Sequence, residues 1–181
     1  MKLWKRIEPT TVQKVGWRTV VSKTFIDNRG NQHVFDIFGN EGQENGAVIA
    51  LTPDNRVIIV QQFRVGPEMI MDELPGGGIE SGEDKQQAVE RELLEETGYK
   101  PGNMEYLGAH HKDAYMNAVW HFYLATDCKK VGEQKLDYEE DIEVKLISIP
   151  QLFDNARHDR MTDPIAVLWA YDKLMNIQEH A

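Results

Sequence analysis

Cysteine is almost absent from this sequence, since Cys128 is the only one among 181 residues. A single cysteine excludes an intramolecular disulfide, and with it the class of small secreted domains that disulfides hold together. We therefore expect Cys128 to be a small buried hydrophobic residue in a strand rather than a nucleophile. We also expect a reducing, cytoplasmic setting for the chain.

Long apolar runs and positive charge are also scarce. No stretch approaches the ~20 apolar residues of a membrane helix, and no apolar run follows the basic start MKLWKR as it would in a signal peptide. The formal net charge of −10 argues against sequence-independent binding to nucleic acid. It would also repel an anionic substrate unless bound cations reversed the local field. We expect neither a membrane nor a nucleic acid as a partner.

The order of the predicted elements indicates the fold class. Alternating β-branched residues predict an N-terminal hairpin over residues 16–38, and a polar loop at 39–45 follows it. We divide the chain there into an N-terminal β subdomain, 1–43, and a main domain, 44–181. Strands interleaved with helices in the main domain predict a mixed sheet between layers of helices, an α/β/α sandwich. The expected strands span residues 46–51, 56–63, 70–74, 104–110, 119–126 and 142–149, and the expected helices span 83–97, 150–158 and a last stretch from 163 onward.

One expected helix carries an unusual cluster of acids. At about 100° per residue, Glu92, Glu95 and Glu96 fall within an arc of about 100°. Carboxylates held this close repel one another unless a divalent cation lies among them. A solvated acidic face is the competing interpretation. Ser81 is the expected N-cap and Gly98 the expected left-handed stop of this helix.

Residues 77–99, GGIESGEDKQQAVERELLEETGY, resemble the Nudix box, G-x5-E-x7-R-E-U-x-E-E-x-G-U, in which U is a bulky aliphatic residue. Every fixed position matches, and Tyr99 is the one departure, at a position that concerns packing rather than chemistry. The resemblance implies the same α/β/α sandwich. The N-terminal hairpin is similar to the added subdomain of the ADP-ribose and nucleotide-sugar branch, in which it crosses to a second subunit and makes a homodimer.

The resemblance also implies a reaction. Members of this branch use Mg²⁺, two or more ions for which Mn²⁺ can substitute, to hydrolyse nucleoside diphosphate sugars such as ADP-ribose or GDP-mannose. The products are a nucleoside monophosphate and a sugar phosphate. Carried over by position, the implied metal ligands are Glu92, Glu96 and the carbonyl of Gly76. Glu95 is implied either as a further ligand or as a catalytic residue that holds a water molecule. Arg91, which we group with the catalytic residues, would lock the helix to the preceding loop together with Glu83 and Gly77.

A general base or further ligand should come from a later acidic loop. The candidates there are Glu139, Glu140, Asp141 and Glu143, and the resemblance favours Glu140, which precedes an Asp-Ile pair at the start of a strand. A solvated loop acid is the competing interpretation for each of them.

Three further residues are candidates for contact with the nucleoside diphosphate-linked substrate. Arg64 resembles an arginine near the diphosphate in the same branch, although a surface charge at a strand end would look the same. Trp17 lies in the N-terminal hairpin, where an aromatic ring could stack on a base across a dimer, and core packing is its alternative. Tyr115 lies near the tyrosine position associated with diadenosine polyphosphate hydrolases.

Two other functions stay open at this point. One is a house-cleaning hydrolase of nucleoside triphosphates or dinucleoside polyphosphates, although the long N-terminal hairpin argues against the smallest of these. The other is a non-catalytic regulator that binds a nucleotide sugar. Such regulators usually lose acids of the box, and this chain keeps all of them.

Overall fold

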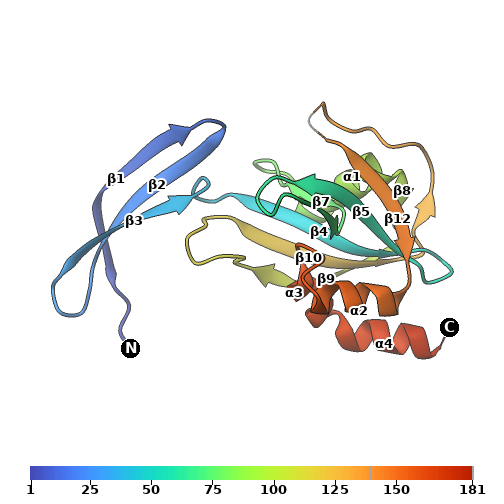
Figure 1. Ribbon diagram of the computed structural model, residues 1–181. Coiled ribbons are helices and arrows are strands. Elements are labelled where there is room, and N and C mark those ends of the chain that lie inside the picture. The colour runs from blue at the N-terminus through green and yellow to red at the C-terminus, as the bar shows by residue number, and fades with distance from the viewer. Residues whose placement is uncertain (139, 181) are drawn as a thin grey trace. The chain divides into compact units, whose positions relative to one another are not determined.

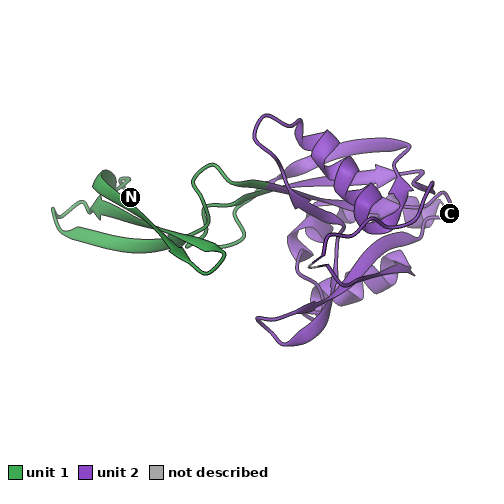
Figure 2. Ribbon diagram, turned by 90° about the horizontal axis from the view of Figure 1, so that it is seen from above, with its two compact units in different colours: residues 1–44, 110–120 green, residues 45–109, 121–181 purple. Residues whose placement is uncertain are grey.

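The computed structural model describes residues 1–138 and 140–180. The chain forms two compact units (Figure 2). Unit 1 comprises Met1–Glu44 and His110–Trp120, and unit 2 comprises Asn45–Ala109 and His121–Ala181. Among the described residues, no helix combines the length and the apolar composition that crossing a bilayer requires.

Unit 1 is built on a three-stranded antiparallel sheet in the order β1-β2-β3, with strands β1 (Lys5–Val15), β2 (Arg18–Ile26) and β3 (Gln32–Phe38). The turn between β2 and β3 is held by the Asp27 carboxylate, which accepts hydrogen bonds from the N–H groups of Arg29 and Asn31 at 2.8 and 2.9 Å. The predicted hairpin is therefore confirmed. Strand β1 was not predicted, because its side chains are nearly all exposed and show no alternation.

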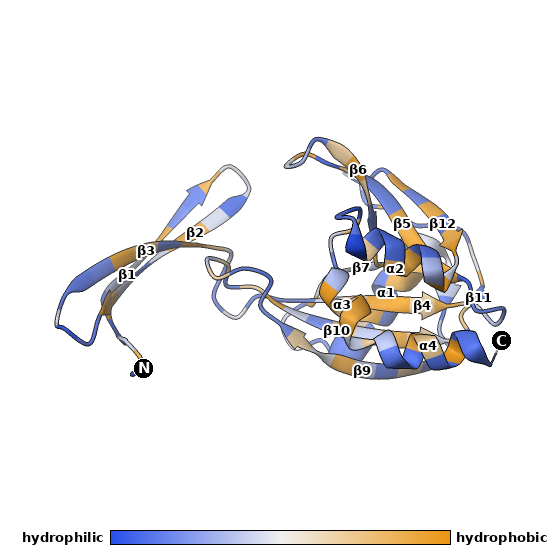
Figure 3. Ribbon diagram, turned by 60° about the horizontal axis from the view of Figure 1, so that its bottom comes forward, coloured by the Kyte–Doolittle hydropathy of each residue, from blue (hydrophilic) through white to orange (hydrophobic). Residues whose placement is uncertain are grey.

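Unit 2 contains a seven-stranded sheet in the order β12-β5-β4-β10-β9, with β6 paired to β5 and β7 paired to β4. A separate two-stranded sheet joins β8 (Tyr99–Lys100) to β11 (Lys129–Lys130). β4 is buried along most of its length, and the orange of much of its ribbon in Figure 3 shows that it is mostly apolar. The strands of the large sheet are β4 (Glu44–Leu51), β5 (Val57–Arg64), β6 (Met69–Glu73), β7 (Gly76–Gly78), β9 (Asn103–His110), β10 (Val119–Thr126) and β12 (Ile142–Ile147).

Helices cover both faces of this sheet (Figure 1). On one face, Tyr123 of β10 packs in a buried cluster with Val89 and Leu93 of α1 (Lys85–Thr97). The next residue back along β10, Phe122, points the other way, and its ring meets Trp169 edge-on at 6.0 Å. The second layer consists of α2 (Ile149–Arg157), α3 (Pro164–Trp169) and α4 (Tyr171–Glu179). The predicted α/β/α sandwich is confirmed.

The start of α1 differs from the prediction. Asp84, not Ser81, is the N-cap, and its carboxylate accepts hydrogen bonds from the N–H groups of the second and third helical residues. Gly82 has a φ of +84°, so the chain is still turning where the sequence analysis placed the first helical residues. Glu83 therefore lies outside the helix. The predicted stop is confirmed, because Gly98 has a φ of +76° and donates its N–H to the carbonyl of Leu94 at 2.8 Å.

Candidate active site

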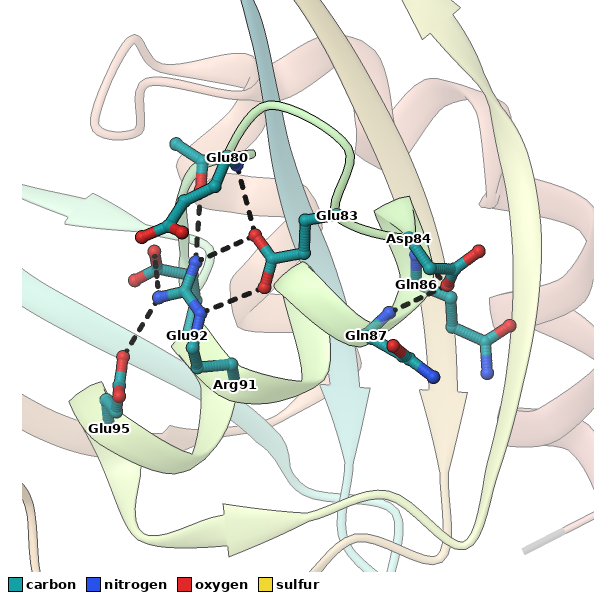
Figure 4. A network of polar contacts seen from close by, with 9 residues as sticks. Glu80, Glu83, Asp84, Gln86, Gln87, Arg91, Glu92 and Glu95 are labelled. Carbon is teal, nitrogen blue, oxygen red and sulfur yellow. Dashed lines mark hydrogen bonds and ion pairs between the residues drawn. The ribbon is translucent and has the colours of Figure 1, made fainter.

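Arg91 is the centre of a polar network on α1 (Figure 4). Its Nη1 donates to Glu92 Oε1 at 2.9 Å and to Glu95 Oε2 at 3.0 Å. Its Nε donates to Glu83 Oε1 at 3.2 Å, and its Nη2 donates to the carbonyl of Gly78 at the same distance. Hydrogen bonding to Glu83 is the main cause that raises the pKa of Arg91. This one guanidinium therefore ties the acidic helix to the glycine strand and to the turn before α1.

Glu96 is the most buried acid of the cluster, with 7% of its surface exposed. Its Oε2 accepts a hydrogen bond from the N–H of Gly76 at 2.9 Å. Burial raises the pKa of Glu96 to about 8, and the negative charges of Glu92, Glu140 and Glu73 act in the same direction. Burial also raises the pKa of Glu92. A cation placed beside these carboxylates would lower both pKa values.

The glycines of β7 allow the close approach between the strand and the acids. Gly76 pairs with Ala47 of β4, and a Cβ at position 76 would lie 2.2 Å from the carbonyl oxygen of Gly46. A Cβ at position 77 would lie 2.6 Å from Cδ and Oε1 of Glu92. Both distances are far below any real contact, so a side chain at either position would displace the sheet or the carboxylate.

The loop between β11 and β12 is fastened to the end of α1. The side-chain amide of Gln134 donates to the carbonyls of Glu96 at 2.7 Å and Ile142 at 3.2 Å, and the N–H of Lys135 donates to the carbonyl of Glu95 at 2.7 Å. These bonds satisfy carbonyls that the last turn of a helix leaves without a partner. They bring the acidic part of the loop to the acidic face of α1.

A cavity of about 280 Å³ lies where the loop, α1 and β7 meet. It is lined by Gly76, Gly77, Gly78, Arg91, Glu92, Glu95, Lys135, Asp137 and Glu140. Glu140 is held in place because its Oε2 accepts the N–H of Asp137 at 2.9 Å, while its own N–H donates to the carbonyl of Asp137 at 3.0 Å. Lys135 and Asp137 were not among the residues predicted for the site. The only signal for Lys135 was a cation within an otherwise acidic loop.

Most of the box residues named from the sequence thus meet at one place. Glu96 is buried and does not line the cavity, but it is bonded to the N–H of Gly76, which does. Glu83 does not line the cavity either, and it is bonded to Arg91, which does. Glu139 lies outside the described residues. Glu143 lies on β12 and pairs with Lys145.

Arg64 lies at the end of β5 and does not line the cavity. Its guanidinium donates two hydrogen bonds, from Nε and from Nη2, to the buried carboxylate of Glu73. That pairing is the main cause that raises the pKa of Arg64, and the charge of Glu96 contributes as well. Arg64 is therefore within electrostatic reach of the acidic cluster.

The two aromatic candidates belong to unit 1. The side chain of Trp17 is 82% exposed, and the guanidinium of Arg18 lies 4.4 Å above its ring. Tyr115 lies 6.3 Å from Phe35, ring to ring, and lines a second cavity of about 740 Å³ that belongs wholly to unit 1. Other aromatic residues of that cavity are Trp4 and Phe25.

The donor set of the unit 2 cavity fits a divalent cation. Within residues 1–138 and 140–180, no three His, Cys, Asp or Glu side chains are gathered closely enough to hold a metal. Arg91 donates to one oxygen each of Glu92 and Glu95, while Glu96 accepts a hydrogen bond from the N–H of Gly76. The guanidinium neutralises the carboxylates that a cation would otherwise neutralise. Hard carboxylate oxygens around a buried acid of raised pKa are the ligands that Mg²⁺ and Mn²⁺ prefer.

Comparison with known proteins places the chain in a family. Residues 43–166 match the NUDIX domain model. The methanol dehydrogenase activator of Bacillus methanolicus is 32% identical over 124 residues, which cover 67% of each chain. The ADP-ribose pyrophosphatase of Bacillus subtilis (strain 168) is 32% identical over 105 residues, or 57% of each chain. A crystal structure of an ADP compounds hydrolase shares the fold, with a TM-score of 0.76, 18% identity and coverage of 95% of this chain and 97% of that one. The chain therefore belongs to the Nudix hydrolase superfamily.

Proposed function

We propose that this protein hydrolyses the pyrophosphate bond of nucleoside diphosphate sugars, with ADP-ribose as its first candidate substrate and Mg²⁺ as its cofactor. The observation that carries the proposal is the cavity lined by a glycine strand, by Glu92 and Glu95 of α1 and by Glu140, with the buried Glu96 bonded to the N–H of Gly76 beside it. The resemblance to an ADP-ribose pyrophosphatase favours ADP-ribose over other nucleotide sugars. The products would be AMP and ribose 5-phosphate.

Glu92, Glu95, Glu96 and the carbonyl of Gly76 would hold the Mg²⁺ ions. When bound, the ions would lower the pKa of a water molecule and neutralise charge on the diphosphate. Arg91 and Glu83 would keep the carboxylates aimed into the cavity through the network already described. Removing those two residues should therefore disturb the position of the ligands rather than their chemistry.

Glu140 is the proposed general base. Its carboxylate lines the cavity, and its Oε2 is fixed by the N–H of Asp137. It would accept a proton from the attacking water as oxygen bonds to one phosphorus, while the bond from that phosphorus to the bridging oxygen breaks and the second phosphate leaves. Arg64, directed by Glu73, would contact the diphosphate and bind its negative charge.

The N-terminal subdomain, residues 1–43, is proposed to form a homodimer and to contact the substrate through Trp17 and, with the segment joined to it, Tyr115. Large apolar side chains on β1 and its turns are exposed, as Val12 at 67% and Trp17 at 82% show. Exposed apolar surface of this kind marks interaction sites in soluble proteins. A single mass at the monomer value in sedimentation equilibrium would remove the dimer from the proposal.

The test is a panel of nucleotide sugars, dinucleoside polyphosphates and nucleoside triphosphates, each incubated with Mg²⁺ and separated by chromatography. We expect ADP-ribose to give AMP and ribose 5-phosphate, and triphosphates to react more slowly. Glu140→Gln should lose about 100-fold in kcat, whereas Glu143→Gln, on β12 and outside the cavity lining, should behave as the wild type. If no diphosphate ester is turned over, the proposed function is wrong.

A further inference from the structure

Two cationic side chains line the active-site cavity, and only one of them pairs with the carboxylates around it. Its charged lining consists of Arg91, Lys135, Glu92, Glu95, Asp137 and Glu140. Arg91 already donates to three carboxylates and one carbonyl. Lys135 makes no ion pair with any other residue among 1–138 and 140–180. Its ammonium group is therefore available to a ligand in a way that the guanidinium of Arg91 is not.

The backbone of Lys135 is fixed although its side chain is exposed. Its N–H donates to the carbonyl of Glu95 at 2.7 Å, and the preceding side chain, Gln134, bridges the carbonyls of Glu96 and Ile142. Two consecutive residues of the loop are thus bonded to the last turn of α1. The lysine stem starts from a defined point at the rim of the cavity, while its four methylene groups leave the ammonium free to follow a ligand.

We infer that Lys135 binds the diphosphate of the substrate directly, at a non-bridging phosphate oxygen. A diphosphate entering this cavity meets four carboxylates, and the bound cations that those acids hold would offset only part of the repulsion. A compact ammonium on a flexible stem binds a phosphate oxygen as a point charge. Lys135 thereby supplies a contact that the residues of the box do not make, since their charges are used on one another and on the metal.

This inference rests on the proposed function, but it is tested by binding as well as by turnover. The probe is the α,β-methylene analogue of ADP-ribose, in which a CH₂ group replaces the bridging oxygen so that no hydrolysis occurs. In the presence of Mn²⁺, Lys135→Met should weaken analogue binding about 10-fold, as expected for loss of one hydrogen bond to a charged group. Turnover of ADP-ribose should show a similar rise in KM with a smaller change in kcat. Lys135→Arg, which keeps the charge, should stay within about 3-fold of the wild type.

Two controls separate this role from its alternatives. Lys130→Met removes an exposed lysine of β11 that lies 3.8 Å from Glu133, outside the cavity, and it should leave analogue binding unchanged. Titration with Mn²⁺ alone should give the same affinity for Lys135→Met and the wild type. A change in Mn²⁺ affinity as large as the change in analogue affinity would show that Lys135 acts on the carboxylates, and it would overturn the inference.

Unaltered analogue binding by Lys135→Met, in a wild-type protein that turns over ADP-ribose, would overturn the inference while leaving the proposed function intact. A wild-type protein that neither binds the analogue nor cleaves any diphosphate ester would overturn both. The two failures are therefore distinguishable.

Discussion

Gly77 and the carboxyl group of Glu92 are in such close contact that a Cβ on Gly77 would lie 2.6 Å from Glu92 Cδ. β7 and α1 can lie this close together because Gly77 has no side chain. In physical terms, the glycine of the box provides the space in which a carboxylate can turn toward the cavity.

We therefore expect Gly77→Ala to displace the Glu92 carboxylate. A misplacement of about 1 Å can cost about 100-fold in rate, so kcat/KM should fall by roughly that factor. Steady-state kinetics with Mg²⁺ and a thermal melt would measure the two effects separately. Gly66→Ala is the matched control, because a Cβ there meets nothing within 4 Å. Wild-type kinetics in Gly77→Ala would show that the glycine serves only the turn.

A second prediction concerns the shape of the Arg91 side chain rather than its charge. Lys at this position could not bond Glu83, Glu92 and the carbonyl of Gly78 together, because it lacks the planar fork. Arg91→Lys should lose about 10-fold or more in kcat. It should also lower the free energy of unfolding by about 1–2 kcal/mol. This value is reduced because Arg91 and its carboxylate partners are partly exposed to solvent. Urea unfolding measures the second effect, and Arg29→Lys, at an exposed turn, is the control that should change neither.

The helix and its stop could be predicted from the sequence, whereas its first residues could not. The helical pattern of apolar and acidic residues ends at Gly98, and glycine is the residue that most readily adopts the left-handed conformation that ends a helix. Its φ of +76° confirms this. Ser81 and Asp84 are both good N-caps, so local chemistry does not choose between them. The turn at Gly82 decides between them, because its φ of +84° is not helical and the helix can begin only after it.

Elements without a local pattern were missed. Residues of β1 such as Val12 and Val15 are exposed, so no alternation of buried and exposed positions was available to find the strand. The place of Lys135 depends on Gln134, whose amide reaches the carbonyl of a residue 38 positions earlier in the chain. Contacts of that separation are fixed by the fold as a whole, and no spacing rule within the loop predicts them.

Cys128 provides a test of the core that is independent of catalysis. It lies between β10 and β11, not in a strand as predicted, but it is fully buried, as expected. Burial raises the pKa of its thiol to about 12, so almost no thiolate is present at pH 8. A thiol reagent such as Ellman's reagent should react with the native protein at least about 100-fold more slowly than with the protein in denaturant. Equal rates in the two conditions would contradict the packing of this residue.

The last prediction concerns the pH dependence of the metal-free protein. The pKa of Glu96 is about 8 in the folded chain and 4.5 without burial. Between these pH values the folded state keeps a proton that the unfolded state has lost, so the free energy of unfolding should decrease as pH rises from 4.5 to 8. Glu96→Gln removes the ionisable group and with it that decrease. At pH 8 with chelator, the variant should therefore be more stable than the wild type, by at most about 4 kcal/mol, while losing nearly all turnover.

Urea unfolding at pH 5 and pH 8, with EDTA and then with Mg²⁺, tests this directly. The difference between Glu96→Gln and the wild type should be small at pH 5 and large at pH 8 with EDTA. Mg²⁺ should stabilise the wild type at pH 8 more than the variant, because a ligand of the folded state stabilises only the protein that binds it. Glu133→Gln, whose side chain is 93% exposed, should follow the wild type throughout. An equal loss of stability with pH in Glu96→Gln and the wild type would mean that the buried carboxyl is not the titrating group.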